Sequence, residues 1–131
     1  MLKGSCLCQQ VQYQIDGTLG PVFFCHCSKC RKANGSAFAA NALINTAEFS
    51  LLSGQDALNE FESSPGVFRV FCKHCASPLY SRRDAQAEQI RLRIGSLDTP
   101  LGELNVTHIF VGSKADWFEI CDSYPQYKER P

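Results

Sequence analysis

Short alternations of apolar and polar residues, separated by turn residues, run through much of this chain. The clearest is residues 89–94, in which isoleucine and leucine alternate with glutamine and arginine. A period of two is typical of a strand that buries one face. Alternation or short apolar runs predict further strands at residues 11–15, 36–44, 48–52, 58–62, 67–71 and 106–111. The chain is therefore expected to be mostly β.

Helical patterns are sparse. Residues 28–33 and 113–118 can each form about one helical turn, and Gly, Pro, Ser and Asp separate the remaining segments. No internal repeat or linker interrupts the pattern. At 131 residues the chain has the size of one ordinary domain, so residues 1–131 are predicted to fold as a single unit.

Seven of the eight cysteines lie in three tight clusters, and these clusters indicate the chemistry of the protein as well as its fold. The clusters are Cys6-x-Cys8, Cys25-x-Cys27-x-x-Cys30 and Cys72-x-x-Cys75. Thiolates are soft ligands that suit zinc, and a closed structural zinc site takes four ligands in a tetrahedron. Seven thiolates fit one saturated structural site and one three-thiolate site with a free position, the kind at which zinc is catalytic. Spacing alone does not fix which clusters pair.

Two alternatives compete with this interpretation. A disulfide framework would also use an even number of cysteines, but a Cys-x-Cys pair is too cramped to bridge and three cysteines within six residues suit a metal better. The middle cluster can also be a second structural site, closed by His26, His74, Cys121 or another side chain.

Basic residues crowd the middle cluster. Lys29, Arg31 and Lys32 can offset the charge of a three-thiolate zinc site or attract an anionic ligand, or they can simply face water on an exposed turn. His26, between two proposed ligands, can be a fourth ligand or a proton shuttle, or can face solvent.

The remaining candidates have plainer interpretations. His74, inside a C-x-x-C turn, is expected to be exposed, and His108 is expected to be a satisfied core or surface histidine. Cys121 follows three large apolar side chains and is expected to be a buried, inert thiol.

Charge and hydropathy limit the classes of partner. Thirteen basic and thirteen acidic residues balance, which disfavours nucleic acid. No window approaches the ~18 apolar residues of a membrane span, and the N-terminus lacks the apolar core of a signal peptide. A cytoplasmic location follows as an expectation, and clustered cysteines there point to metal or redox chemistry. The sequence makes no prediction of oligomeric state.

Together these motifs resemble the glutathione-dependent formaldehyde-activating (GFA) family, which has an Mss4-like fold. The three cysteine clusters occur in family order and spacing, and the C-terminal pattern is also similar, with His108, Lys114, Trp117, Asp122 and Pro125. Two positions depart from the family: Gln9 and Ala76 stand where the family tends to have glycine. Both departures touch local turn geometry and spare the ligands.

The resemblance implies a ligand assignment and an activity. Cys6, Cys8, Cys72 and Cys75 would hold a structural zinc, and Cys25, Cys27 and Cys30 a catalytic one, within small antiparallel sheets packed around the metal. The implied reaction is of the carbon–sulfur lyase class and joins glutathione, or a similar small thiol, with formaldehyde into S-hydroxymethylglutathione. Lys29, Arg31 and Lys32 would then bind the carboxylates of glutathione.

Two functions of other classes remain open on the sequence. One is a non-catalytic zinc module that binds a protein partner, as other Mss4-like domains do. The other is a redox enzyme similar to zinc-containing methionine sulfoxide reductases, with Cys121 as nucleophile. Glu119 and Asp122 argue against the second, because nearby carboxylates raise the pKa of a thiol.

Overall fold

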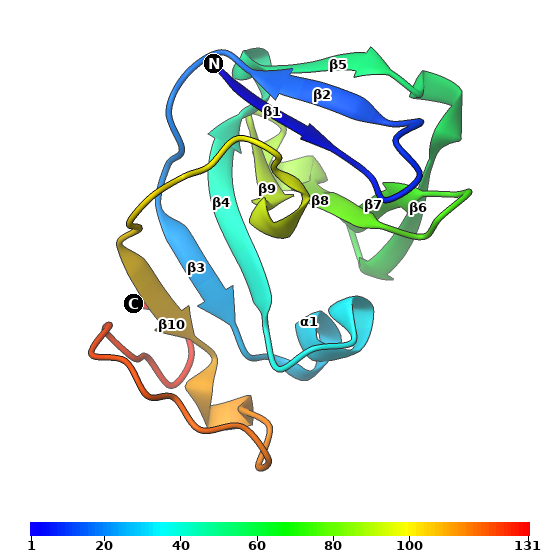
Figure 1. The fold of residues 1–131 in the computed structure, drawn as a ribbon. Helices are drawn as coiled ribbons and strands as arrows, with labels where there is room; N and C mark the ends of the chain where they lie inside the picture. Colours follow the sequence, from blue (N-terminus) through cyan, green and yellow to red (C-terminus); the bar gives the residue numbers. More distant parts are fainter.

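The fold consists of two β-sheets, one short helix and a long C-terminal segment, seen in a computed structural model that describes residues 1–131 (Figure 1). The strands are β1 (Leu2–Ser5), β2 (Gln12–Ile15), β3 (Val22–Cys25), β4 (Ala39–Asn45), β5 (Phe49–Ser53), β6 (Leu58–Ser64), β7 (Val67–Cys72), β8 (Pro78–Arg83), β9 (Gln89–Arg93) and β10 (Val106–Ile109). The helix is α1 (Ser28–Asn34), and the 3-10 turns are η1 (Thr46–Glu48), η2 (Gln55–Ala57), η3 (Asp84–Gln86), η4 (Ile94–Ser96) and η5 (Val111–Ser113).

The strands form a three-stranded sheet in the order β1-β2-β5 and a seven-stranded sheet in the order β10-β3-β4-β9-β8-β7-β6. All neighbours are antiparallel except β10 and β3. The prediction of a mostly β chain with antiparallel sheets is confirmed.

Most elements predicted from the sequence are present. All seven predicted strands occur with shifted ends, and the turn expected at residues 28–33 is α1. The helical turn expected at 113–118 is wrong, because only η5 forms there and irregular chain follows. β1, β3 and β8 were not predicted. β1 is short and contains a glycine, β3 is a run of four residues without alternation, and β8 opens with proline and ends in polar residues.

The apolar core lies between the two sheets. Tyr13 and Ile15 of β2 contribute from the small sheet, and Ala42 of β4 lies opposite Leu92 of β9 in the large one. Tyr13, Ile15 and Leu92 are at most 1% exposed. Burying side chains of this size stabilises a fold by about 1.5–3 kcal/mol each. The alternation along β9 thus places leucine and isoleucine in the core and arginine on the opposite face.

The parallel pairing of β10 with β3 brings the C-terminal segment, residues 106–131, to the middle cysteine cluster. Ile109 lies opposite Cys25, and the amide of His26 donates to the carbonyl of Ile109 at 3.0 Å. The C-terminal segment continues along the other edge of β10, where the amide of Tyr127 donates to the carbonyl of His108 at 2.9 Å. Cys25 and Ile109, which are 84 positions apart in sequence, therefore become neighbours.

Candidate metal centres

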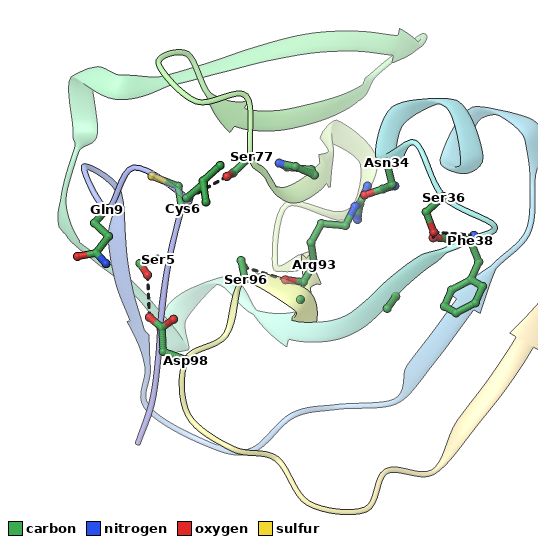
Figure 2. A pocket seen from close by; sticks show the side chains of 14 residues that line it. Ser5, Cys6, Gln9, Asn34, Ser36, Phe38, Ser77, Arg93, Ser96 and Asp98 are labelled. Carbon is green, nitrogen blue, oxygen red and sulfur yellow. Dashed lines mark hydrogen bonds between the residues drawn. The ribbon is translucent and has the colours of Figure 1, made fainter.

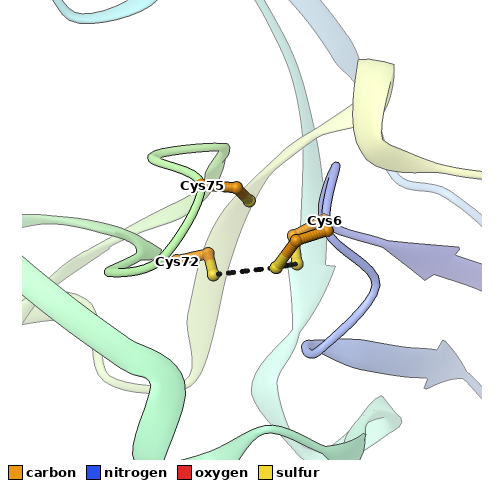
Figure 3. A group of neighbouring side chains, drawn as sticks. Cys6, Cys72 and Cys75 are labelled. Carbon is orange, nitrogen blue, oxygen red and sulfur yellow. Dashed lines mark hydrogen bonds between the residues drawn. The ribbon is translucent and has the colours of Figure 1, made fainter.

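Four thiols from two distant turns converge at the first centre. Cys6 and Cys8 come from the turn between β1 and β2, while Cys72 ends β7 and Cys75 lies in the turn that follows it. Figure 3 shows Cys6, Cys72 and Cys75 facing one another. All four Sγ atoms lie within 4.8 Å of one another, with Cys6–Cys8 at 3.6 Å and Cys8–Cys72 at 3.8 Å.

These spacings fit a metal and not a disulfide. A disulfide needs an S–S distance of about 2.05 Å. A tetrahedral ion with metal–sulfur bonds of about 2.3 Å places its ligands about 3.8 Å apart. The four sulfurs are therefore arranged as the ligands of one ion.

Hydrogen bonds with the backbone and with a serine hold these thiols. The amide of Val11 donates to Cys6 Sγ at 3.3 Å, and the hydroxyl of Ser77 lies 3.3 Å from Cys75 Sγ. The Ser77 hydrogen bond is the main cause that lowers the pKa of Cys75 to about 5. Stabilising the thiolate form prepares Cys75 to bind a cation.

The two positions at which the chain departs from the family share one backbone feature. Gln9 has φ 65° and Ala76 has φ 63°, so each lies in the left-handed region directly after the last cysteine of its turn. The amides of both residues point back to the first cysteine: Gln9 N donates to Cys6 O at 3.0 Å and Ala76 N to Cys72 O at 2.7 Å. Both turns thus need a conformation that glycine adopts at little cost and other residues adopt under strain.

Glycine at either position is expected to stabilise the protein. The left-handed conformation costs a residue with a Cβ about 1–2 kcal/mol, partly offset by the greater unfolded-state entropy of glycine. We expect Gln9→Gly and Ala76→Gly each to raise the free energy of unfolding by about 0.5–1 kcal/mol, measured by urea denaturation with the metal bound.

Gly35→Ala is the matched control for this prediction. Gly35 has φ 60° in the C-cap of α1, and an added Cβ would meet no atom within 4 Å, so only backbone strain changes. The control should lose about as much stability as the two variants gain. A loss of stability in both Gln9→Gly and Ala76→Gly would contradict this account of the turns.

The middle cluster forms a second group of three thiols. Cys25 ends β3, Cys27 is the N-cap of α1, and Cys30 lies in the first turn of that helix. Their Sγ atoms lie within 4.8 Å of one another, and the amide of Cys30 donates to Cys27 Sγ at 3.3 Å. The helix therefore starts at one of the three cysteines and turns the third sulfur back towards the first two.

The three thiols share their protons unequally. Hydrogen bonds from Cys25 and Cys30 are the main causes that lower the pKa of Cys27 to about 2, while the same contacts raise the pKa of Cys25. Both guanidinium Nη atoms of Arg69 lie 3.8 Å from Cys30 Sγ. A divalent ion would replace the shared protons, so this donor set fits a thiolate-binding metal.

No histidine, carboxylate or further cysteine completes this second group as a fourth ligand. His26 is fully buried, with its Nε2 2.8 Å from His108 Nδ1. His108 Nε2 in turn lies 3.0 Å from a carboxylate oxygen of Asp122. If Asp122 accepts from His108, then His26 donates to His108. This chain of hydrogen bonds fixes the imidazole ring of His26 behind the Cys25–Cys27 segment.

The other candidates named from the sequence are now placed. His108 is a satisfied core histidine and His74 is exposed, as expected. The expected burial of Cys121 is wrong: its thiol is exposed, in a loop where the side chain of Trp117 is also 68% exposed. The aromatic neighbours suggested a core segment that does not form.

The three basic residues of the middle cluster differ in their surroundings. Lys29 Nζ donates to the carbonyl of Ser63 at 3.0 Å and to the hydroxyl of Ser64, both at the end of β6. Lys32 is exposed, and the Nε atom of Arg31 is buried without a hydrogen-bond partner. Lys29 is therefore partly engaged within the protein, whereas Lys32 faces water.

Two cavities flank the centres. The larger, about 520 Å³, lies beside the first centre, with Cys6 at one end and Ser36 and Phe38 at the other (Figure 2). The smaller, about 230 Å³, is lined by Cys25 and Cys30 themselves. Only the smaller cavity gives a ligand direct access to sulfurs of the middle cluster. Sequence reasoning missed it, because its lining comes from strands whose pairing the sequence does not show.

No helix in the structure combines the length and the hydrophobicity needed to cross a lipid bilayer.

Known proteins resemble the chain in sequence and in fold. A protein of Aspergillus flavus named "Putative glutathione-dependent formaldehyde-activating enzyme" is 27% identical over 116 residues, which are 87% of this chain and 54% of that protein. A Schizosaccharomyces pombe protein named as an uncharacterized lyase is 28% identical over 78 residues, covering 60% of this chain and 55% of that protein. The chain spans about half the length of these curated relatives.

The crystal structure of a Rhodobacter sphaeroides protein shares the fold, with a TM-score of 0.65 and 20% sequence identity, over 79% of this chain and 98% of that one. The model of the family described as "Glutathione-dependent formaldehyde-activating enzyme" matches residues 1–113, a range that includes all seven clustered cysteines. The chain therefore belongs to the glutathione-dependent formaldehyde-activating family.

Proposed function

We propose that residues 1–131 act as one zinc-dependent enzyme domain that joins a small thiol, glutathione or a close relative, to formaldehyde. Cys6, Cys8, Cys72 and Cys75 would hold a structural zinc. Cys25, Cys27 and Cys30 would hold the catalytic one. The names of the family and of the relatives support this assignment at the level of a lyase that uses glutathione and formaldehyde.

The observation that carries the proposal is the difference between the two thiol groups. The first offers four thiols, enough to saturate a tetrahedral ion, and the second offers three and has no other side-chain ligand within reach. The second group also lines a cavity, through Cys25 and Cys30. A structural centre needs no such access, whereas a catalytic centre does.

The proposed reaction is an addition. The sulfur of the thiol bonds to the carbon of formaldehyde, the C=O π bond becomes a C–O single bond, and the thiol proton ends on that oxygen. Nothing is oxidised or reduced. Zinc supplies Lewis acidity, which lowers the pKa of a thiol or polarises an aldehyde.

The protein's own groups would bind and orient the reactants. The three cysteines hold the ion at the cavity, and holding thiol and aldehyde together supplies the proximity effect. His26, whose pKa burial lowers to about 4, is neutral at physiological pH and adds no positive charge behind the cluster. The carboxylates of glutathione remain predicted to bind to the basic residues of the middle cluster, Lys29, Arg31 and Lys32.

Binding and turnover test the proposal together. Isothermal titration of glutathione into the zinc-loaded protein should give a heat of binding, and the loaded protein should accelerate formaldehyde consumption in the presence of glutathione. The same protein with formaldehyde alone is the control. Absence of both binding and turnover would refute the named activity.

A further inference from the structure

The face of the large sheet that points away from the core carries a group of arginines instead of ordinary surface residues. Arg69 of β7 lies opposite Ser81 of β8, and Ser81 lies opposite Arg91 of β9. Residues two positions along each strand share a face, so Arg83 and Arg93 join the same group. These four, Arg69, Arg83, Arg91 and Arg93, are called here the arginine face; all four line the 230 Å³ cavity that reaches Cys25 and Cys30.

No acidic side chain neutralises the arginine face. The ion pairs of the molecule join Arg82 to Glu60 and Asp84, and His108 to Asp122, and none involves these four arginines. The cavity lining contains no aspartate or glutamate. Arg130, from the C-terminal segment, adds a fifth guanidinium group at the same cavity.

Several of these groups are buried with hydrogen-bonding capacity left over. Arg93 is only 6% exposed, and its Nη1 donates to neutral acceptors, Asn41 Oδ1 at 2.7 Å and the carbonyl of Arg91 at 3.1 Å. Arg83 Nε and Arg91 Nη1 are buried without any partner. A buried, unpaired guanidinium donor is costly in free energy. Several of them in one cavity therefore indicate that their charge serves to bind a ligand.

The neighbouring thiolates do not account for the charge. Three thiolates on a divalent ion carry one net negative charge, enough for one of the four guanidinium groups. Arg69, at 3.8 Å from Cys30 Sγ, is the one placed to offset it. Burial, and then the nearby charge of Arg83, lower the pKa of Arg91 to about 10, in keeping with positive charges that lack a counter-ion.

We propose that the arginine face binds a small molecule with at least two anionic groups, carboxylate or phosphate, and holds it against the middle cysteine cluster. The fork of donors on each guanidinium matches either group bidentately. At about 230 Å³ the cavity suits a compact anion or the acidic end of a larger one. The inference rests on the proposed function for its role, because it assigns the anionic groups of the thiol substrate to these arginines.

Titrations with three probes that cannot react test the inference. S-methylglutathione carries two carboxylates and a blocked sulfur, succinate is a plain dicarboxylate, and inorganic phosphate is the alternative anion. Each is titrated calorimetrically into the zinc-loaded full chain at low and at high salt. At least one should bind with one-to-one stoichiometry and lose affinity as salt increases. The probe that binds most tightly shows whether the substrate anion is carboxylate or phosphate.

Arg82 and Arg83, neighbours on β8, provide a matched pair of variants, and Arg91 of β9 provides a second test on the arginine face. Arg83→Gln and Arg91→Gln should each weaken binding of that probe at least tenfold. Arg82→Gln should change it less than twofold, because Arg82 is on the opposite face, over the ring of Phe68 and paired with Glu60. The melting temperatures of ligand-free Arg83→Gln and Arg91→Gln should equal or exceed that of the wild type, since each substitution removes an unpaired buried charge.

No heat with any of the three probes, or equal affinity in all variants, would overturn the inference. Failure of the proposed reaction is distinguishable from this outcome. Tight, arginine-dependent binding of S-methylglutathione without turnover of glutathione would keep the anion site and remove the reaction. Turnover that is unaffected by Arg83→Gln and Arg91→Gln would keep the reaction and remove the anion site.

Discussion

Replacing Cys72 by serine is expected to abolish the cooperative fold. Cys72 is fully buried, and its Sγ lies 3.8 Å from Cys8 Sγ in the four-thiol centre, which ties the small sheet to the β7–β8 turn. A structural zinc contributes about 10–16 kcal/mol, comparable to the entire net stability of a domain, about 5–15 kcal/mol. Circular dichroism during heating should show no cooperative transition for Cys72→Ser.

The control for this variant lies in the same turn. His74 is exposed and outside the group of thiols, so His74→Ala should change stability by no more than about 0.5 kcal/mol. A chelator added to the wild type should reproduce the effect of Cys72→Ser. A Cys72→Ser protein that melts cooperatively near the wild-type temperature would show that the centre does not hold the fold together.

Replacing Cys27 by serine is expected to remove turnover and leave a folded protein. The side chain of Cys27 caps α1 by accepting from the amide of Cys30, and serine is a favoured N-cap residue, so the helix keeps its start. The middle centre loses one of its three thiolates. Loss of about 4 kcal/mol of transition-state stabilisation corresponds to about a thousandfold slower reaction.

Three measurements check the Cys27 variant: formaldehyde consumption, zinc content and thermal melting. We expect turnover reduced at least a thousandfold, one zinc per chain and a melting transition that stays cooperative. Cys121→Ser is the control, because Cys121 is an exposed cysteine outside both centres, and it should keep full activity. Wild-type turnover by Cys27→Ser would exclude a catalytic role for the middle centre.

The sequence predicted the groups of thiols because each half of a group is local. Cys6 and Cys8 are two residues apart, and Cys72 and Cys75 three, so each pair is set by one turn. Which turns meet depends on how β1, β2, β7 and β8 come together, and spacing contains no information about that. Only the family resemblance supplied the pairing that the structure shows.

The alternation at residues 89–94 predicted β9 and its core face correctly. It did not predict that the arginines of the other face are buried and grouped. Arg91 and Arg93 were expected only as the polar side of a half-buried strand. Arg93 is instead almost fully buried, because β4 and β8 flank it in the sheet and Asn41 accepts from its guanidinium. The arginine face arises from the registers of three neighbouring strands, which a single sequence does not show.

Long-range contacts explain what was missed around the middle cluster. The hydrogen bond from His26 to His108 joins residues 82 positions apart, through the parallel pairing of β3 with β10. His26 had three interpretations on the sequence, and burial behind the cluster excludes the solvent-facing one. Cys121 was misjudged because nearby aromatic residues are a poor sign of burial in a segment without strand or helix.

The metal content of the purified protein tests the central claim most directly. Protein prepared without chelators, and quantified by amino-acid analysis, can be measured by inductively coupled plasma mass spectrometry. One saturated four-thiol centre and one three-thiol centre predict two zinc ions per chain in the wild type. A folded, cooperative protein with no bound metal would contradict the central claim. A wild type that binds only one ion per chain, with the same content in Cys27→Ser, would remove the proposed catalytic centre.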